Sequence, residues 1–222
     1  MHPAVLTTGL AGLDRVLHGV AAGDNIVWQV QEIEDYVGLV RPYAEAARAA
    51  GARLIYFRFA DHPPLLPDGF GAEVHTPRPG DGFEAFVDQV HAVIEEAGRG
   101  AMYLFDCLSA LAEAWQADQL LGNFFRLTCP RLFDLETVTY FAVYRNRHTV
   151  YAMRAIAETT QWMLDVFRRT GQLYIRPLKV QHRSKEAMNL IHAWEGEEFL
   201  PAVDSATVSE ILADSEWPGL QA

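Results

Sequence analysis

The sequence is poor in the features that mark several large classes of protein. Its 222 residues contain two cysteines, Cys107 and Cys129, too few for a disulfide framework and not at the spacing of metal ligands. No apolar run approaches the roughly 20 residues that cross a bilayer, and Met1-His2-Pro3 lacks the pattern of a signal peptide. We therefore expect a cytoplasmic protein in a reducing compartment, with no membrane partner.

Positive charge is also scarce. The 18 basic residues are outnumbered by 29 acidic ones, which gives a formal net charge of −11. Non-specific binding of nucleic acid relies on basic side chains that displace counterions, so we expect no nucleic-acid partner. Hydrophobic residues make up 50% of the chain, enough for one α/β domain to bury a sizeable core. We expect a single domain over residues 1–203, followed by a C-terminal tail or linker at 204–222.

The spacing of apolar residues predicts alternating strands and helices. Apolar and β-branched runs predict strands near residues 25–30, 53–59, 101–106 and 138–144, with helical spacing in between. Pro42 predicts a kink or a break in the helix that follows the first strand. From residue 160 the period changes to two, which is typical of antiparallel strands. These patterns predict an α/β fold with a doubly wound, mostly parallel sheet, helices on both faces and antiparallel strands appended at the C-terminal end.

The turn after the first expected strand has the outline of a phosphate-binding loop without its chemistry. Such a loop reads GxxxxGK[ST], with glycines that bring N–H groups to phosphate, a lysine for the outer oxygens and a hydroxyl for magnesium. Residues 30–37 read VQEIEDYV instead. The side chains that replace the loop are Gln31, Glu32, Glu34, Asp35 and Tyr36.

Charge in this turn opposes nucleotide binding. Each of the three carboxylates would repel a triphosphate by on the order of 1–3 kcal/mol at an effective dielectric constant near 20. Glu34 and Asp35 are also expected at the positive N-terminal end of the following helix, where an anion would otherwise bind. We therefore expect no cofactor, with ATP and magnesium bound weakly or not at all. An ordinary strand and helix of any α/β domain would explain the same residues.

Polar residues follow the other expected parallel strands. Asp106 could hold the water shell of a magnesium ion, or it could cap the next helix. The basic group at residues 145–148 could bind an anion, or it could pair with nearby carboxylates. Because strands of a doubly wound sheet end at one edge, a rebuilt enzyme or ligand site could form there. Its candidate residues are Asp61, His62, Asp106, Arg145 and His148.

Three segments resemble the KaiC/RecA-like superfamily of P-loop ATPases. The opening TG-x-x-GLD-x-x-L-x-G spans residues 8–19, residues 106–111 (DCLSAL) are similar to the family's D-S-L-S-A-L, and residues 173–183 resemble its late strand. The resemblance covers roughly residues 7–203 and implies a RecA-like fold. Ala60 stands where these ATPases usually carry the acid that helps to activate water. The chain therefore resembles a degenerate member that lacks the Walker A motif.

This resemblance implies a catalytically inactive, pseudo-ATPase domain with no catalytic residues and no metal site. We expect it to act as a protein-interaction or regulatory module, with a protein partner or as a homo-oligomer. In the family the late strand carries a lysine and an arginine that reach a neighbouring subunit, so Lys179 and Arg183 are interface candidates, or else exposed strand residues. The alternative is an ATP-binding or ligand-binding enzyme with a rebuilt site at the sheet edge, with a weaker resemblance to segments of phosphoenolpyruvate synthase-like proteins.

Overall fold

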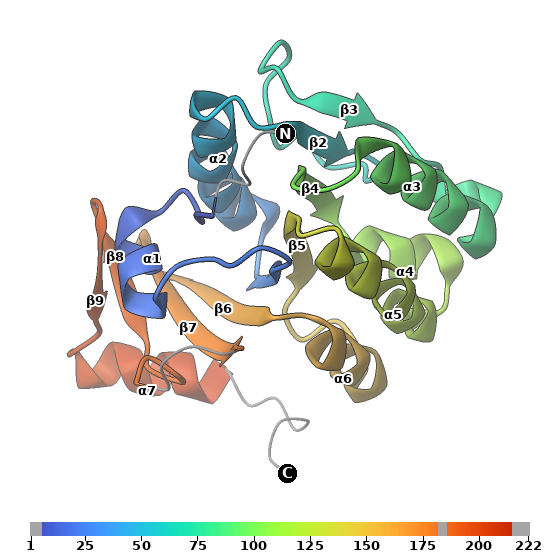
Figure 1. The fold of residues 1–222 in the computed structure, drawn as a ribbon. Coiled ribbons are helices and arrows are strands. Elements are labelled where there is room, and N and C mark those ends of the chain that lie inside the picture. The colour runs from blue at the N-terminus through green and yellow to red at the C-terminus, as the bar shows by residue number, and fades with distance from the viewer. Residues whose placement is uncertain (1–5, 182–185, 215–222) are drawn as a thin grey trace.

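A computed structural model describes residues 6–181 and 186–214, and its framework is one nine-stranded sheet. The strands are β1 (Asn25–Val30), β2 (Leu54–Phe57), β3 (Glu73–His75), β4 (Met102–Cys107), β5 (Val138–Tyr144), β6 (Trp162–Arg169), β7 (Gln172–Val180), β8 (His192–Glu195) and β9 (Glu198–Pro201). They lie in the order β3-β2-β4-β5-β1-β6-β7-β8-β9 (Figure 1). Strands from β3 to β6 pair in parallel and strands from β6 to β9 pair antiparallel. This arrangement confirms the expected fold class.

Helices lie on both faces of the sheet. They are α1 (Ala11–Leu17), α2 (Ile33–Ala49), α3 (Phe83–Ala97), α4 (Ser109–Trp115), α5 (Asp118–Asp134), α6 (Val150–Thr159) and α7 (Ser205–Asp214). Trp28 of β1 belongs to the core shared with α1 and α2, whereas Val27 belongs to the core shared with α3 and α5. Both side chains are fully buried, as expected for a central parallel strand covered on two faces.

Of the kink or break expected at Pro42, the break is absent, because α2 runs from Ile33 to Ala49 through Pro42. The helical spacing expected between the strands at 101–106 and 138–144 corresponds to two helices, α4 and α5, separated where Gln116 adopts a left-handed conformation. At the other end of the chain, Ile211 of α7 is buried against Phe167 and Ile191. The expected tail beyond residue 214 lies outside the described residues.

The opening segment is shaped by packing. Gly9 has a φ of 79°, and a Cβ there would overlap the backbone of Pro42. A Cβ at Gly12 would overlap the carbonyl oxygen of Glu197, beside β9. Asp14 accepts hydrogen bonds from the backbone N–H of Thr8 (2.9 Å) and from its hydroxyl (2.7 Å). Each part of the opening motif thus has a structural cause.

Candidate functional site

The connection between β1 and α2 is too short to surround a phosphate. β1 ends at Val30 and α2 begins at Ile33, so Gln31 and Glu32 alone join them. A GxxxxGK[ST] loop needs several residues whose N–H groups converge on an anion. Gln31 and Glu32 are exposed, and no side chain caps the first turn of α2. Both the short connection between β1 and α2 and the carboxylates of this turn therefore oppose phosphate binding.

Asp35 lies in the first turn of α2, as expected from the sequence, but no side chain makes a capping hydrogen bond there. Its side chain is 1% exposed, and Nε and Nη2 of Arg168 both lie 2.7 Å from its Oδ1. The Arg168 guanidinium offsets the charge of Asp35, since a buried carboxylate needs a partner. Glu34 is exposed, whereas Tyr36 is fully buried and donates a hydrogen bond to the carbonyl oxygen of Phe105 at 3.2 Å.

Asp106 is fully buried, and both of its carboxylate oxygens accept hydrogen bonds from other residues of the chain. Oδ1 accepts a hydrogen bond from the Tyr56 hydroxyl at 2.5 Å. Oδ2 accepts from the backbone N–H groups of Phe59 (2.8 Å) and Ala60 (2.9 Å). Asp106 therefore fixes the segment that leaves β2, and it does not cap α4, which begins without a side-chain cap. A magnesium ion would have to displace these donors.

Asp61 and His62 line a cavity of about 430 Å³ together with Cys107, Glu113 and Tyr144. The Cys107 N–H lies 3.3 Å from His62 Nε2, and His62 Nδ1 lies 2.8 Å from the carbonyl oxygen of Pro63. These partners assign the Nδ1-protonated, neutral tautomer, with Nε2 as an acceptor. The 3.6 Å separation between Nε2 and Asp106 Oδ1 is then no hydrogen bond. Burial raises the pKa of the Cys107 thiol to about 11, so it is not a thiolate at neutral pH.

His148 belongs to a hydrogen-bonded chain of serine, histidine and aspartate. The Ser109 hydroxyl lies 2.7 Å from His148 Nε2, and His148 Nδ1 lies 2.6 Å from Asp118 Oδ1. Asp118 also accepts hydrogen bonds from the backbone N–H and the hydroxyl of Thr149. Burial alone would raise the pKa of Asp118, but the hydrogen bonds from Thr149 and His148 outweigh it and lower that pKa. This is the order of groups in a hydrolase triad.

The reactive atom of that chain is not open to a substrate. Ser109 is 2% exposed, and its oxygen accepts a hydrogen bond from the Tyr144 N–H at 2.8 Å. The neighbouring cavity is lined by Ala110 and Tyr144 but not by Ser109 itself. In this conformation the hydrogen bonds among Ser109, His148 and Asp118 connect the segments that follow β4 and β5 to the start of α5.

Arg145 lies apart from this group, beside β6. Its guanidinium lies 3.8 Å from the centre of the Phe167 ring and donates to the carbonyl oxygen of Asp214, at the end of α7, at 3.0 Å. Burial lowers the pKa of Arg145. Nearby, Asp165 is buried and accepts a hydrogen bond from Gln29 Nε2 at 2.8 Å. Burial raises the pKa of Asp165 to about 6, against the opposing effect of Arg145 and Arg176.

Lys179 is engaged within its own chain. Its Nζ donates to the carbonyl oxygens of Ala157 (2.6 Å) and Thr160 (2.5 Å), at the C-terminal end of α6. Such a cation satisfies carbonyl groups that a helix end leaves without partners. Arg183 lies outside the described residues.

The structure thus places Asp61 and His62 in the lining of one cavity, with Asp106 buried 3.6 Å from His62. His148 pairs with Ser109 instead, and Arg145 lies against Phe167. Sequence reasoning missed Ser109, Asp118 and Asp165. Asp118 begins α5 only because the structure divides the helical region at Gln116, and its pairing with His148 depends on the fold. Within residues 6–181 and 186–214, no three His, Cys, Asp or Glu side chains are grouped to hold a metal ion. No helix in those ranges is long and apolar enough to cross a bilayer.

Comparison with known proteins adds no relative: neither the protein-family models nor the curated protein sequences give a match to this chain.

Proposed function

We propose that this chain is a RecA/KaiC-like domain that does not hydrolyse ATP and acts as a protein-interaction or regulatory module. The observation that carries the proposal is the connection of Gln31 and Glu32 between β1 and α2, which leaves no loop for a phosphate. The engaged carboxylate of Asp106 supports it, since that residue has no free oxygen for a hydrated magnesium ion.

Calorimetric titration with ATP and magnesium tests the absence of nucleotide binding. We expect no saturable heat at millimolar nucleotide, because the turn offers carboxylates where a phosphate needs N–H donors. A dissociation constant in the low micromolar range would overturn the proposal. Magnesium-dependent hydrolysis that disappears in Asp106→Asn would replace it with an enzyme.

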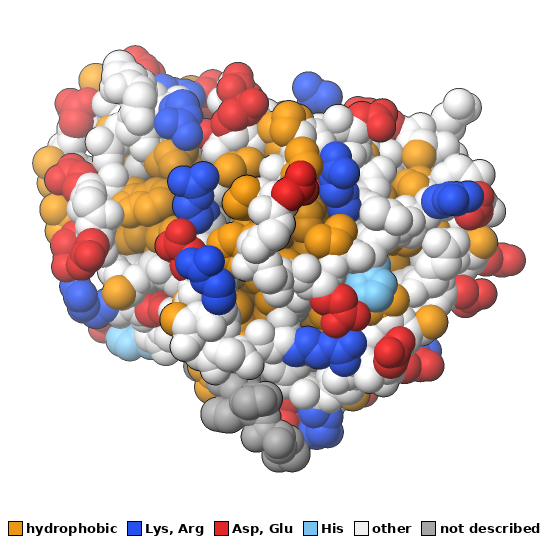
Figure 2. Space-filling view, turned by 90° about the horizontal axis from the view of Figure 1, so that it is seen from above, with side chains coloured by type: hydrophobic (Ala, Val, Ile, Leu, Met, Phe, Trp, Pro, Cys, Tyr) orange, Lys and Arg blue, Asp and Glu red, His pale blue; other side chains and the backbone are white. Residues whose placement is uncertain are grey.

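Exposed apolar side chains support a role in association. Figure 2 shows hydrophobic side chains gathered in hollows between charged groups of both signs on one face. In the C-terminal part, Leu190 and Val203 are 50% and 94% exposed. They flank Ile191 and Ala202, which are joined by a backbone hydrogen bond of 2.8 Å, so they lie near one another beside the β8–β9 ladder. Exposed apolar groups that lie together are typical of interaction surfaces.

A double variant at this surface tests the role. We expect Leu190→Ser with Val203→Ser to lose a partner or to give a smaller assembly in light scattering and in pull-downs from the native cell. Leu127→Ser is the matched control, because Leu127 is also 50% exposed but lies on α5. Equal association in all three proteins, with unchanged circular dichroism, would count against this surface. Lys179→Glu is unsuitable, because it would also remove the bonds to the end of α6.

An enzymatic function at the same edge is the second candidate. The arrangement of Ser109, His148 and Asp118 favours it, since the three groups contact one another in the order of a hydrolase triad. A fluorophosphonate probe tests it directly, because an activated serine forms a covalent adduct with the probe. Labelling of the parent that is lost in both Ser109→Ala and His148→Gln would establish a reactive serine. Under the interaction-module proposal, no labelling is expected.

A further inference from the structure

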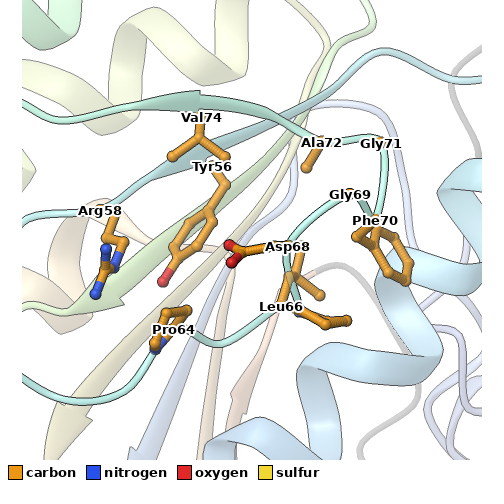
Figure 3. Close-up of a pocket in the computed structure, with 11 residues that line it drawn as sticks. Tyr56, Arg58, Pro64, Leu66, Asp68, Gly69, Phe70, Gly71, Ala72 and Val74 are labelled. Atoms are coloured by element: carbon orange, nitrogen blue, oxygen red, sulfur yellow. The ribbon is translucent and has the colours of Figure 1, made fainter.

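A second cavity, of about 300 Å³, lies beyond β2 on the α2 side of the sheet. Its floor is formed by Tyr56, Arg58 and Val74, from β2 and β3 and the residue after β2. Its far wall is the proline- and glycine-rich segment 64–72, which the Tyr56 hydroxyl holds through the backbone N–H of Leu65 at 3.1 Å. In Figure 3 the Tyr56 ring lies between the guanidinium of Arg58 and the carboxylate of Asp68.

Arg58 is the unusual residue of this cavity. Its Nε is buried and has no hydrogen-bond partner among the described residues, and it forms no ion pair with them. Arg53, just before β2, is paired by contrast: it donates to Glu73 of β3 at 2.9 and 3.1 Å. A buried donor without a partner is unfavourable, so native proteins rarely keep one unless something else satisfies it. A carboxylate matches a guanidinium best, because it can accept two parallel hydrogen bonds.

The other residues that line the cavity indicate which further chemical groups a ligand would carry. Asp68 supplies a negative charge on the side of the cavity opposite Arg58, which favours an ammonium group and disfavours a phosphate dianion. Leu66, Phe70 and Val74 supply an apolar surface. The cavity volume is at the lower end of the range for small-molecule sites.

We propose that this cavity binds a small α-amino acid with an apolar side chain. Its carboxylate pairs with Arg58, its ammonium group with Asp68, and its side chain lies against Leu66, Phe70 and Val74. The site is separate from the turn after β1, and the proposal does not depend on the function proposed above.

A set of matched ligands tests the two charges separately. Leucine is compared with 4-methylpentanoate, which lacks the amine, and with 3-methylbutylamine, which lacks the carboxylate. Titration calorimetry and amide chemical shifts should show saturable binding of leucine, with each analogue about tenfold weaker or more, since each loses one charge-assisted hydrogen-bonded pair. Absence of binding by leucine, methionine and phenylalanine up to about 10 mM would overturn the proposal. Equal binding of leucine and both analogues would also overturn it, because the charges would then play no part.

Substitutions assign the contacts. Arg58→Gln should weaken leucine binding about tenfold or more while the affinity for 3-methylbutylamine is unchanged, and Asp68→Asn should do the converse with 4-methylpentanoate. Arg154→Gln and Asp88→Asn, on α6 and α3, are controls that remove the same charges elsewhere. Folding is checked by circular dichroism. If Arg58→Gln and Asp68→Asn are folded and bind leucine as the parent does, the ligand does not occupy this cavity.

Discussion

Two regions at the end of β2 differ in whether their buried polar groups have hydrogen-bond partners. Around Asp106, the carboxylate accepts hydrogen bonds from Tyr56, Phe59 and Ala60. Around Arg58, a buried guanidinium nitrogen has no partner among the described residues. Tyr56 links the regions, because its ring lines the cavity beside Arg58 while its hydroxyl donates to Asp106.

The difference separates structural polar groups from groups available to a ligand. A saturated carboxylate contributes to stability and cannot bind a metal ion without losing its donors. Arg58 lines the cavity and its Nε makes no hydrogen bond with the described residues, so under the proposal above its guanidinium would pair with an external anion. By this criterion Asp106 is a structural residue, and under the proposal above the ligand binds in the cavity beside it.

Asp106→Ala should give the largest effect. The change leaves the Tyr56 hydroxyl and two backbone N–H groups without an acceptor in a buried site, so we expect a loss of about 3–4 kcal/mol in the free energy of unfolding. Urea denaturation measures it. Asp61→Ala is the control, because that neighbouring acid is exposed and should change the value by less than about 0.5 kcal/mol. A similar small loss for both would show that Asp106 is not structural.

Asp165 tests a buried carboxylate whose pKa is raised. Its ordinary value of 3.8 applies to the unfolded chain, and the folded value is about 6. Between these pH values the folded state binds more protons, so the contribution of Asp165 to stability falls as the pH rises through this window. We expect Asp165→Asn to gain up to about 3 kcal/mol relative to the parent between about pH 4 and about pH 7. A difference that is constant with pH, measured by urea denaturation, would contradict the shift.

Asp35 tests an ion pair with one exposed partner. Asp35→Ala should cost about 2 kcal/mol, less than a fully buried pair, because the Arg168 side chain is 42% exposed. A double-mutant cycle with Arg168→Ala should show coupling of more than about 0.5 kcal/mol. Additive losses would indicate that Asp35 acts through the helix end instead. Glu34→Ala, at an exposed position of the same turn, should be nearly neutral.

Arg58→Gln should give the smallest effect. Without ligand we expect the free energy of unfolding to stay within about 0.5 kcal/mol of the parent, because the buried Nε has no partner to lose. Thermal and urea unfolding of the two proteins provide the comparison. A loss above about 2 kcal/mol would mean that the guanidinium is satisfied in solution by the protein itself.

The strands could be predicted from the sequence because a buried strand appears as a local run of apolar and β-branched residues. The run from Val138 to Tyr144 is β-branched and aromatic, and the expected bounds agree with those of β5. The side-chain pairings could not be predicted. Asp35 meets Arg168 across 133 positions of the chain, and Ser109 meets His148 across 39. The sequence of the turn after β1 gives its negative charge directly. Its partner Arg168 could not be predicted, because the contact depends on β6 becoming a neighbour of β1.

The central place of β1 has a consequence for how the chain folds during synthesis. β1 is synthesised early, yet it pairs with β5 and β6, which come much later in the chain. Asn25 donates a hydrogen bond to Gln161, and Gln29 donates one to Asp165, each across 136 positions. Loop closure of this length slows folding. Until the ribosome has released β5, the apolar β1 has neither neighbour, and one of its edges stays open until β6 follows, a state prone to aggregation. The last strands can meet α1 at Gly12 only after this interval has passed.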